Sequence, residues 1–387
     1  MKIASIKIGL LPRVLMAIVA GMMFGQLMNE SWVRLFVTFN DLFSQLLGFF
    51  IPLIIMGLVT AAISDMGRHA GRMLLLAVGI AYADTVFCGL LSYGTGRLVF
   101  PSVLGGMGTV APNSAQALAP YFSIQIPAMV DIMSALVFSF TLGICIAYHE
   151  MPTLQNIVKE GKMVVEKSIS HLLIPLLPLY IFGIFLTMSY VGQVLSIMSL
   201  FASVIVIIIV LHVFILLYQF VAAGIIAHRN PLRLLWTMFP AYLTALGTSS
   251  SAATIPVTLR QTIKNGVSES TAGFCIPLCA TIHMSGSVMK ITSCALAICM
   301  LEGLPMDFGL FLHFILMLCV VMVAAPGVPG GCIMAALAPL ASILGFNTEQ
   351  QALMITIYIA MDSFGTACNV TGDGAIALLV DKLSVKK

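Results

Sequence analysis

The sequence predicts an all-α polytopic membrane protein, folded as a single integral membrane domain over residues 1–387. The first observation is composition: 60% of the residues are hydrophobic and only 9% are charged. The second is a mean hydropathy of +1.08, and both observations lie outside the range of soluble globular domains. The third is that apolar runs near the roughly 20 residues needed to cross a bilayer recur along the whole chain.

Charge and cysteine content argue against other classes. The net charge of +3 is small and scattered, which argues against a nucleic-acid partner. The nine cysteines lie inside apolar runs without CxxC pairs, so we expect neither a disulfide framework nor a zinc site. Lys2, Lys7 and Arg13 precede the first apolar run, but no A-x-A cleavage motif follows. We therefore expect this run to be retained as the first helix.

The first part of the chain contains regular apolar segments bounded by polar residues. They predict helices at about 8–28, 32–63, 70–99, 126–149, 162–190 and 194–227. Each of these segments is long enough to cross the hydrocarbon core.

The second part of the chain interrupts this pattern twice. The segment 231–262 is broken at GTSSSA, a spanning segment follows at 266–301, and 307–343 is broken at APGVPGG before a last helix at 348–383. Irregular backbone at membrane depth is tolerated only when protein buries it or it lines a cavity. We therefore expect eight transmembrane helices and two re-entrant helical hairpins that meet at a site.

Basic residues predict the orientation. If both termini are cytoplasmic, 15 of the 18 Lys and Arg residues fall on the inner side, as the positive-inside tendency requires. Only Arg34 and Arg97 fall outside, and Lys290 lies in the middle of a span. The expected location is the cell inner membrane, crossed several times.

The last helix carries the densest polar chemistry, in MDSFGTACNVTGD. At 100° per residue, Asp362, Thr366, Asn369 and Asp373 lie at about 0°, 40°, 340° and 20°, which is one narrow stripe. Charged residues at the bilayer centre cost several kcal/mol and usually mark substrate or ion pathways. The alternative is a buried polar ladder that joins helices.

Four motifs carry a resemblance to a known family. SSSAATIP, PLCATIHMSGS, GVPGG and NVTGD occur in that order between the expected helices. This chain resembles the glutamate transporter family, the dicarboxylate/amino acid:cation symporters, and is closer to its neutral amino acid (serine/threonine-type) members. The similarity is clear from about residue 160 to residue 383. It implies a homotrimer, with a static scaffold at about 1–66 and 126–190 and an elevator-type transport domain at about 67–100 and 194–383.

The resemblance implies a substrate site around the two hairpin tips. At the first tip, helix starts and backbone amides meet the substrate carboxylate, and Pro256 resumes the helix. Asp362 is the residue expected to hold the substrate ammonium. The expected substrate-binding residues are Ser250, Ser251, Ser287, Val328, Gly330, Asp362, Gly365, Thr366 and Asn369.

The resemblance also implies two sodium sites. One would use Thr281 and Met284 with carbonyls just before the second tip, at Met322, Val323 and Ala325. The other would use Asn369 and Asp373 with backbone near Cys279 and His283.

A third family sodium site is in doubt, because this chain departs from the pattern there. Where the family has NMDGT, this chain has HMSGS, so the aspartate is Ser285 and its neighbouring asparagine is His283. Tyr82 and Thr85 resemble contributors to this site, and Asp84 adds a carboxylate that the family pattern does not require.

Lys290 lies about ten helical residues, roughly 15 Å, from the nearer end of its span, which is farther than its side chain can snorkel. We expect it to face a cavity and to pair with a carboxylate, either Asp84 or an aspartate of the last helix at 348–383. His283, Ser287 and Lys290 are spaced as one face of a continuous helix. His283 itself is either a satisfied buried imidazole or a proton carrier.

The missing arginine predicts the substrate. In acidic-amino-acid members an arginine pairs with the substrate side-chain carboxylate, and that position is Gly365 here. A second substrate carboxylate would be buried without a partner, so we expect sodium-coupled symport of a small neutral amino acid such as serine, threonine, alanine or cysteine. No cofactor is expected besides Na+ as the coupling ion, with H+ as a possible substitute. The alternatives are a proton-coupled amino acid or dicarboxylate symporter and, with less support, a channel.

An enzyme is not expected. Asp362 and Asp373 are 11 residues apart on one helix, roughly 16 Å along its axis, so they cannot share a proton as an aspartyl protease dyad does. Ser250 or Ser251 as a nucleophile would need a nearby base, for which His283 is the only plausible candidate.

Overall fold

A computed structural model describes residues 10–65, 72–104, 118–149, 151–192, 194–323, 325 and 330–384. Over these residues the protein is helical and contains no strand, which confirms the predicted class. The helices are α1 (Leu10–Gly25), α2 (Glu30–Asp65), α3 (Arg72–Leu104), α4 (Ile132–Tyr148), α5 (Pro152–Ser168), the π-turn η1 (Ile169–Leu173), α6 (Ile174–Tyr190), α7 (Val194–Ala227), α8 (Pro231–Thr248), α9 (Ser251–Lys264), α10 (Glu269–Ile282), α11 (Ser285–Glu302), α12 (Phe308–Met322), α13 (Gly331–Ser342), α14 (Thr348–Ala360) and α15 (Asp362–Ser384).

Two of the six regular helices start elsewhere than predicted. α4 begins at Ile132 rather than at 126, because Asp131 caps it by accepting the N–H of Ser134 at 3.0 Å. The segment predicted at 162–190 begins ten residues earlier, at Pro152. The polar face of α5 hid this extension from a search for apolar runs, since its hydrophobic residues recur at helical spacing between charged ones.

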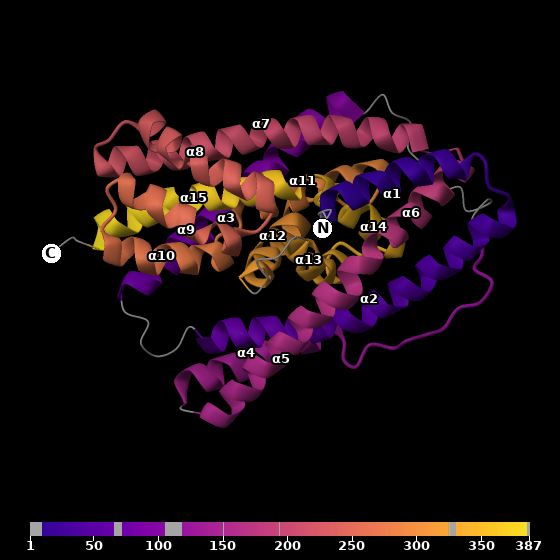
Figure 1. Ribbon diagram of the computed structural model, residues 1–387, viewed down its shortest axis with the longest axis horizontal. Coiled ribbons are helices and arrows are strands. Elements are labelled where there is room, and N and C mark those ends of the chain that lie inside the picture. The colour runs from indigo at the N-terminus through magenta and orange to yellow at the C-terminus, as the bar shows by residue number, and fades with distance from the viewer. Residues whose placement is uncertain are drawn as a thin grey trace, which may run out of the picture.

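The helices pack as two groups (Figure 1). In the first group α2 contacts α4, α5 and α6, and α1 lies along α6. In the second group α15 is central and contacts α3, α7, α8, α9, α10 and α11. The two groups meet where α13 contacts α2 and α4, and where α14 contacts α1 and α6. A static scaffold and a mobile transport domain stay a prediction, because contacts within one arrangement do not show motion.

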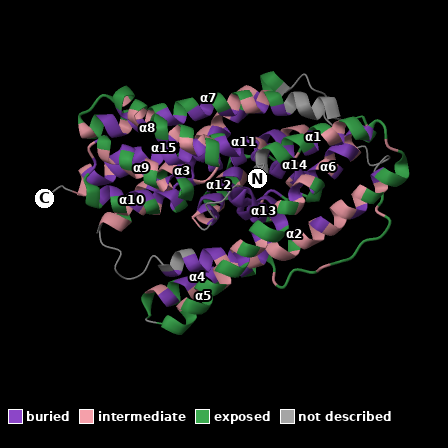
Figure 2. Cartoon of the chain, viewed as in Figure 1, coloured by how far each residue is buried: buried purple, intermediate pink, exposed green. Residues whose placement is uncertain are grey.

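The core of the second group is polar as well as apolar. Figure 2 shows buried residues concentrated in α11, α13 and α15. Every residue of α11 from Ser285 to Cys299 is buried, as is the polar stripe from Asp362 to Asp373. The stripe therefore faces protein and not lipid.

Both predicted hairpins are present. α8 ends at Thr248, and the next residue, Ser249, adopts a left-handed conformation with φ of 50°. α9 begins directly after Ser250, whose side chain accepts the N–H of Ala253. Pro256 lies inside α9, so the prediction that it resumes the helix is wrong: the serine cap restarts the helix first. α12 and α13 form the second hairpin, with Gly330 at φ of 76° before α13.

Two helices predicted as continuous are broken. The segment 266–301 divides into α10 and α11, because His283 is extended (φ −100°, ψ 98°). The last segment bends by 63° at Met361, between α14 and α15. At each break a polar or charged residue contacts other helices: His283 at the first and Asp362 at the second.

The number of membrane spans stays a prediction. By length and composition, five described helices could cross a membrane, or six if α14 and α15 count as one. α1, α4, α12 and α13 contain shorter apolar stretches.

Glycines let α1 approach α6 closely. Gly21 and Gly25 are four residues apart, the spacing of a small-residue interface between membrane helices. A Cβ atom at Gly25 would lie 2.5 Å from the carbonyl oxygen of Leu186 and 2.5 Å from Cβ of Ser189. The backbones are therefore in direct contact, and no larger residue fits.

We predict that Gly25→Ala lowers the melting temperature of the purified protein, because overpacking costs about 1–3 kcal/mol. Gly79→Ala is the matched control, since a Cβ atom there meets nothing within 4 Å. Thermal unfolding in detergent measures both. Equal melting temperatures for the two variants would contradict this account of the contact.

Candidate functional site

Both hairpin tips reach the first turn of α15. The N–H of Gly330 donates to Asp362 Oδ2 at 2.8 Å. On the other side, Ser249 Oγ lies 2.7 Å from Ser363 Oγ. The two tip residues, Ser249 and Gly330, are 81 positions apart in sequence and contact one carboxylate and its neighbour.

Several helices begin around this turn. α9 and α13 start at the two hairpin tips, and α15 starts at Asp362. α11 starts at Ser285. Helix starts carry unpaired N–H groups and a partial positive charge, which makes them anion-binding sites. Ser250 caps α9, and Ser251 directly behind it is buried. The arrangement can hold an anionic group opposite Asp362.

Asn369 joins α15 to the start of α11. Its Oδ1 accepts the N–H of Gly286 at 2.8 Å and that of Ser287 at 3.4 Å. Its Nδ2 donates to Ser287 Oγ at 3.1 Å, and this hydroxyl also lies 3.0 Å from the Tyr358 hydroxyl. Thr366, one turn earlier, donates to the carbonyl of Asp362.

Lys290 is fully buried next to Asp362. Its ammonium donates to the carbonyl of Met361 at 3.1 Å, lies 3.9 Å from Asp362 Oδ1, and sits 3.9 Å from the centre of the Tyr358 ring. Of the two predicted partners, the aspartate of the last helix is therefore the one that Lys290 contacts, and it is Asp362 on α15. Asp84 is engaged by another residue, so pairing of Lys290 with Asp84 is wrong.

The predicted common face of His283, Ser287 and Lys290 is also wrong. The break before Met284 turns His283 away from the α11 axis.

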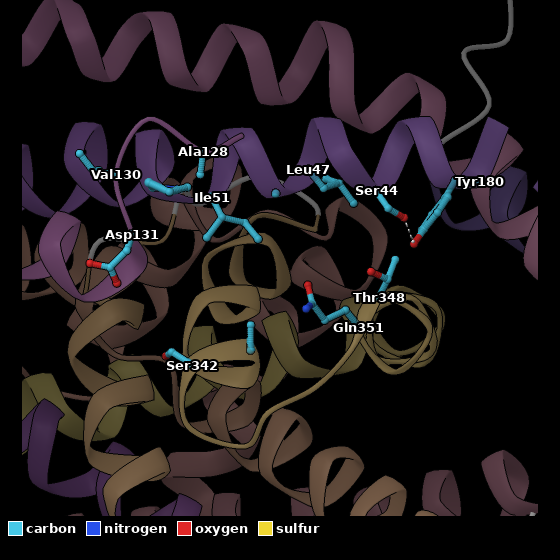
Figure 3. A pocket seen from close by; sticks show the side chains of 13 residues that line it. Ser44, Leu47, Ile51, Ala128, Val130, Asp131, Tyr180, Ser342, Thr348 and Gln351 are labelled. Atoms are coloured by element: carbon cyan, nitrogen blue, oxygen red, sulfur yellow. Dashed lines mark hydrogen bonds between the residues drawn. The ribbon is translucent and has the colours of Figure 1, made fainter. Parts of the chain in front are cut away.

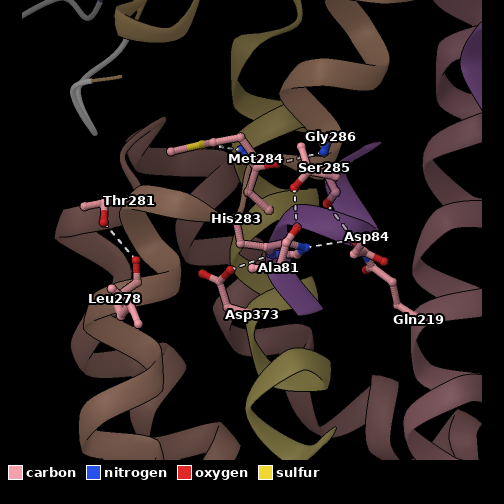
Figure 4. A network of polar contacts seen from close by, with 12 residues as sticks. Ala81, Asp84, Gln219, Leu278, Thr281, His283, Met284, Ser285, Gly286 and Asp373 are labelled. Carbon is pink, nitrogen blue, oxygen red and sulfur yellow. Dashed lines mark hydrogen bonds and ion pairs between the residues drawn. The ribbon is translucent and has the colours of Figure 1, made fainter. Parts of the chain in front are cut away.

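His283 bridges two carboxylates (Figure 4). Its Nδ1 lies 2.9 Å from Asp373 Oδ1 and its Nε2 lies 2.8 Å from Asp84 Oδ2. Since an ionised carboxylate only accepts, the three groups must share enough protons to supply both hydrogen bonds. Asp84 also accepts from Gln219 Nε2 at 2.8 Å and from the Tyr218 hydroxyl. The bridge ties α3, α7 and α15 to the break after α10.

The predicted sodium ligands have protein partners of their own. Thr281 Oγ1 donates to the carbonyl of Leu278, and Met284 Sδ accepts from Asn369 Nδ2. The carbonyls of Cys279 and Met322 accept the N–H groups of His283 and Ala325. Val323 is half-buried.

Two expected contributors have partners away from the bridge. Tyr82 donates to the carbonyl of Leu316 on α12, and Thr85 to that of Ala81, so neither contacts the bridge through its hydroxyl in the described structure. Val328 lies outside the described residues.

Sequence reasoning missed Tyr218, Gln219 and Tyr358. The signal for the first two was visible: YQ interrupts the long apolar run of α7, where polar side chains need a partner. Tyr358 precedes the bend at Met361, and only the bend brings its ring under Lys290.

A cavity of about 370 Å³ lies between the two helix groups, away from the polar site around Asp362 and His283 (Figure 3). Ser44, Ile51 and Tyr180 line it from the first group, and Ser342 and Gln351 from the second. None of its lining residues belongs to the polar site.

These features define the class: a helical membrane protein with two re-entrant hairpins closing on buried charges. The chain belongs to the sodium:dicarboxylate symporter family, whose profile matches residues 10–383. It is therefore a member of a symporter family, as the four motifs predict.

Individual relatives cover the chain to different extents. The serine/threonine transporter SstT of Acinetobacter baumannii (strain AYE) is 26% identical over 399 residues, 97% of each chain. Excitatory amino acid transporter 3 of Mus musculus is 34% identical over 164 residues, 42% of this chain and 31% of that one. Excitatory amino acid transporter 2 of Homo sapiens is 32% identical over 161 residues, 41% of this chain and 28% of that one. These relatives are transporters, which agrees with the expectation that the chain is not an enzyme.

We predict that Asp84→Asn lowers the melting temperature strongly, because it removes one charge from the buried bridge. Breaking a buried ion pair by removing one partner costs about 3–5 kcal/mol. Asp307→Asn is the control: Asp307 caps α12 from an exposed position, and asparagine caps equally well. Thermal unfolding compares the two variants. An Asp84→Asn protein as stable as the control would show that His283 does not depend on this carboxylate.

Proposed function

We propose that the protein is a sodium-coupled symporter of small neutral amino acids. The observation that carries this proposal is the convergence of both hairpin tips on the first turn of α15, at Asp362 and Ser363. One carboxylate at the meeting point of several helix starts is complementary to a zwitterion. The substrate ammonium would pair with Asp362, and its carboxylate would meet the amides at the start of α9.

Neutral side chains are favoured by the surroundings of Gly365. This position has no side chain of its own to pair with a second substrate carboxylate. Lys290, the basic residue that the described structure places against it, is already next to Asp362 and the Tyr358 ring. The serine/threonine transporters that match 97% of the chain support the same substrate class.

Sodium coupling is supported by the family to which the chain belongs. Thr281, Met284 and the carbonyls from Met322 to Ala325 would form one site, and Asn369 with Asp373 would contribute to another. Backbone and hydroxyl oxygens are suitable ligands for a hard cation. H+ could replace one Na+ as a coupling ion.

The assembly follows from the same proposal. We infer a homotrimer in the cell membrane, held together by the first helix group, with both termini cytoplasmic. The second helix group would move as an elevator-type transport domain. Its contacts with the first group run mainly through α13 and α14, which supports movement as a unit.

We predict that serine and threonine outcompete aspartate and glutamate for uptake of labelled serine into vesicles that contain the purified protein. The reason is that a second substrate carboxylate near Gly365 would add a buried negative charge that Lys290 does not balance, because the charge of Lys290 is already paired with that of Asp362. Thermal stabilisation by each amino acid, with and without sodium, gives an independent ranking. Aspartate as the best competitor would overturn the neutral-substrate proposal.

We predict that Thr281→Val weakens the apparent sodium affinity of uptake while the fold is retained, since it removes one oxygen ligand from an exposed side chain. Thr141→Val is the control, because Thr141 is also exposed and also donates to its own helix, where Oγ1 lies 2.8 Å from the carbonyl oxygen of Val137. Uptake is measured over a range of sodium concentrations. Uptake that needs no sodium, and is driven by a pH gradient instead, would favour the proton-coupled alternative.

A further inference from the structure

We propose that Lys290 is the residue that reads the substrate side chain, by donating a hydrogen bond to a hydroxyl on the carbon next to the amino-bearing one. This inference rests on the proposed function and narrows it from small neutral amino acids to hydroxylated ones.

The placement of Lys290 carries the argument. α11 brings its side chain through the core to the first turn of α15, where both hairpin tips close. A Cβ atom at Gly365 would lie 2.3 Å from Lys290 Cε and 2.4 Å from Nζ. Lys290 therefore fills the space beside Gly365. A residue with a side chain at position 365 would force Lys290 to move.

The ammonium has hydrogen-bonding capacity left. Of its three protons, one is donated to Met361 O, the hydrogen bond given for it in the described part of the chain. Asp362 Oδ1 at 3.9 Å is an ion-pair partner but is too far for a hydrogen bond. A cation buried with one hydrogen bond gains from a further acceptor.

The pair of charges matches a specific substrate geometry. Asp362 offers an acceptor and Lys290 offers a donor 3.9 Å away. Serine and threonine carry an ammonium and a hydroxyl on neighbouring carbons, so the ammonium can meet Asp362 while the hydroxyl oxygen meets Lys290. Alanine and valine keep the first contact and lack the second.

Lys290 also limits size. Its side chain fills the volume beside Gly365, and the ring of Tyr358 packs against the ammonium of Lys290. A larger side chain on the substrate would have to displace a buried, charged residue. The same residue thus favours a small hydroxylated side chain and excludes a bulky one.

The test uses pairs of amino acids that differ in one hydroxyl group, in vesicles containing the full-length protein. Threonine against valine, and serine against alanine, are compared as competitors of labelled serine uptake. The wild type should prefer the hydroxylated member of each pair by about ten- to hundredfold, the range for a hydrogen bond to a charged group. Lys290→Met should bring the threonine-to-valine ratio near one, and Lys290→Gln, which keeps a donor without the charge, should retain part of it.

Two further variants separate reading from folding. Thr292→Val is the control, because Thr292 is buried on the same helix with an unpartnered hydroxyl, and its variant should keep the wild-type ratio. Gly365→Ala leaves Lys290 in the chain but pushes its end group away, so it should lower the ratio without removing the charge. It also serves if the Lys290 variants do not fold.

The outcomes distinguish the two proposals. A wild type that prefers serine to aspartate but takes up threonine and valine equally overturns the Lys290 proposal and leaves the proposed function standing. The same holds if Lys290→Met folds and keeps the wild-type ratio. A wild type that ranks aspartate above every neutral amino acid overturns the proposed function itself.

Discussion

The structure depends on burying charges inside a membrane protein without leaving any of them unpaired. His283 meets this constraint at one place by lying between Asp84 and Asp373, all three almost fully shielded from solvent. Each residue comes from a different helical segment, so the bridge holds α3 and α15 to the end of α10. A charge in this position without its partners would cost several kcal/mol. Polar chemistry thereby becomes a structural element of the second helix group.

The same constraint explains where the helices break. At His283, at Met361 and at the second hairpin tip, backbone groups leave the helix and bond to side chains of other helices. Asn369 satisfies the start of α11, and Asp362 accepts the N–H of Gly330. Irregular backbone survives at this depth because other helices supply its hydrogen bonds. The starts of α9 and α13 lie at the two tips and that of α15 at Asp362, so three helix N-termini gather around one turn.

Lys290 and Gly365 show how two positions on different helices form one feature. Sequence comparison by position sees a missing side chain at 365 and, separately, an unexplained lysine at 290. In the structure the lysine occupies the space that the glycine leaves open. The charge at the site is thus supplied from α11, and its reach, direction and donor geometry differ from those of a side chain on α15.

The sequence by itself determined the class, most helices, both interrupted hairpins and the stripe on α15, because hydropathy and helical periodicity are local properties. The four motifs also determined the family. Only the tertiary structure decided that His283 pairs with Asp84 and Asp373, that Lys290 pairs with Asp362, and that two long segments break. These outcomes depend on which partners are within reach once the helices pack. Residues 199 positions apart, such as Asp84 and His283, leave no periodic signal of their contact.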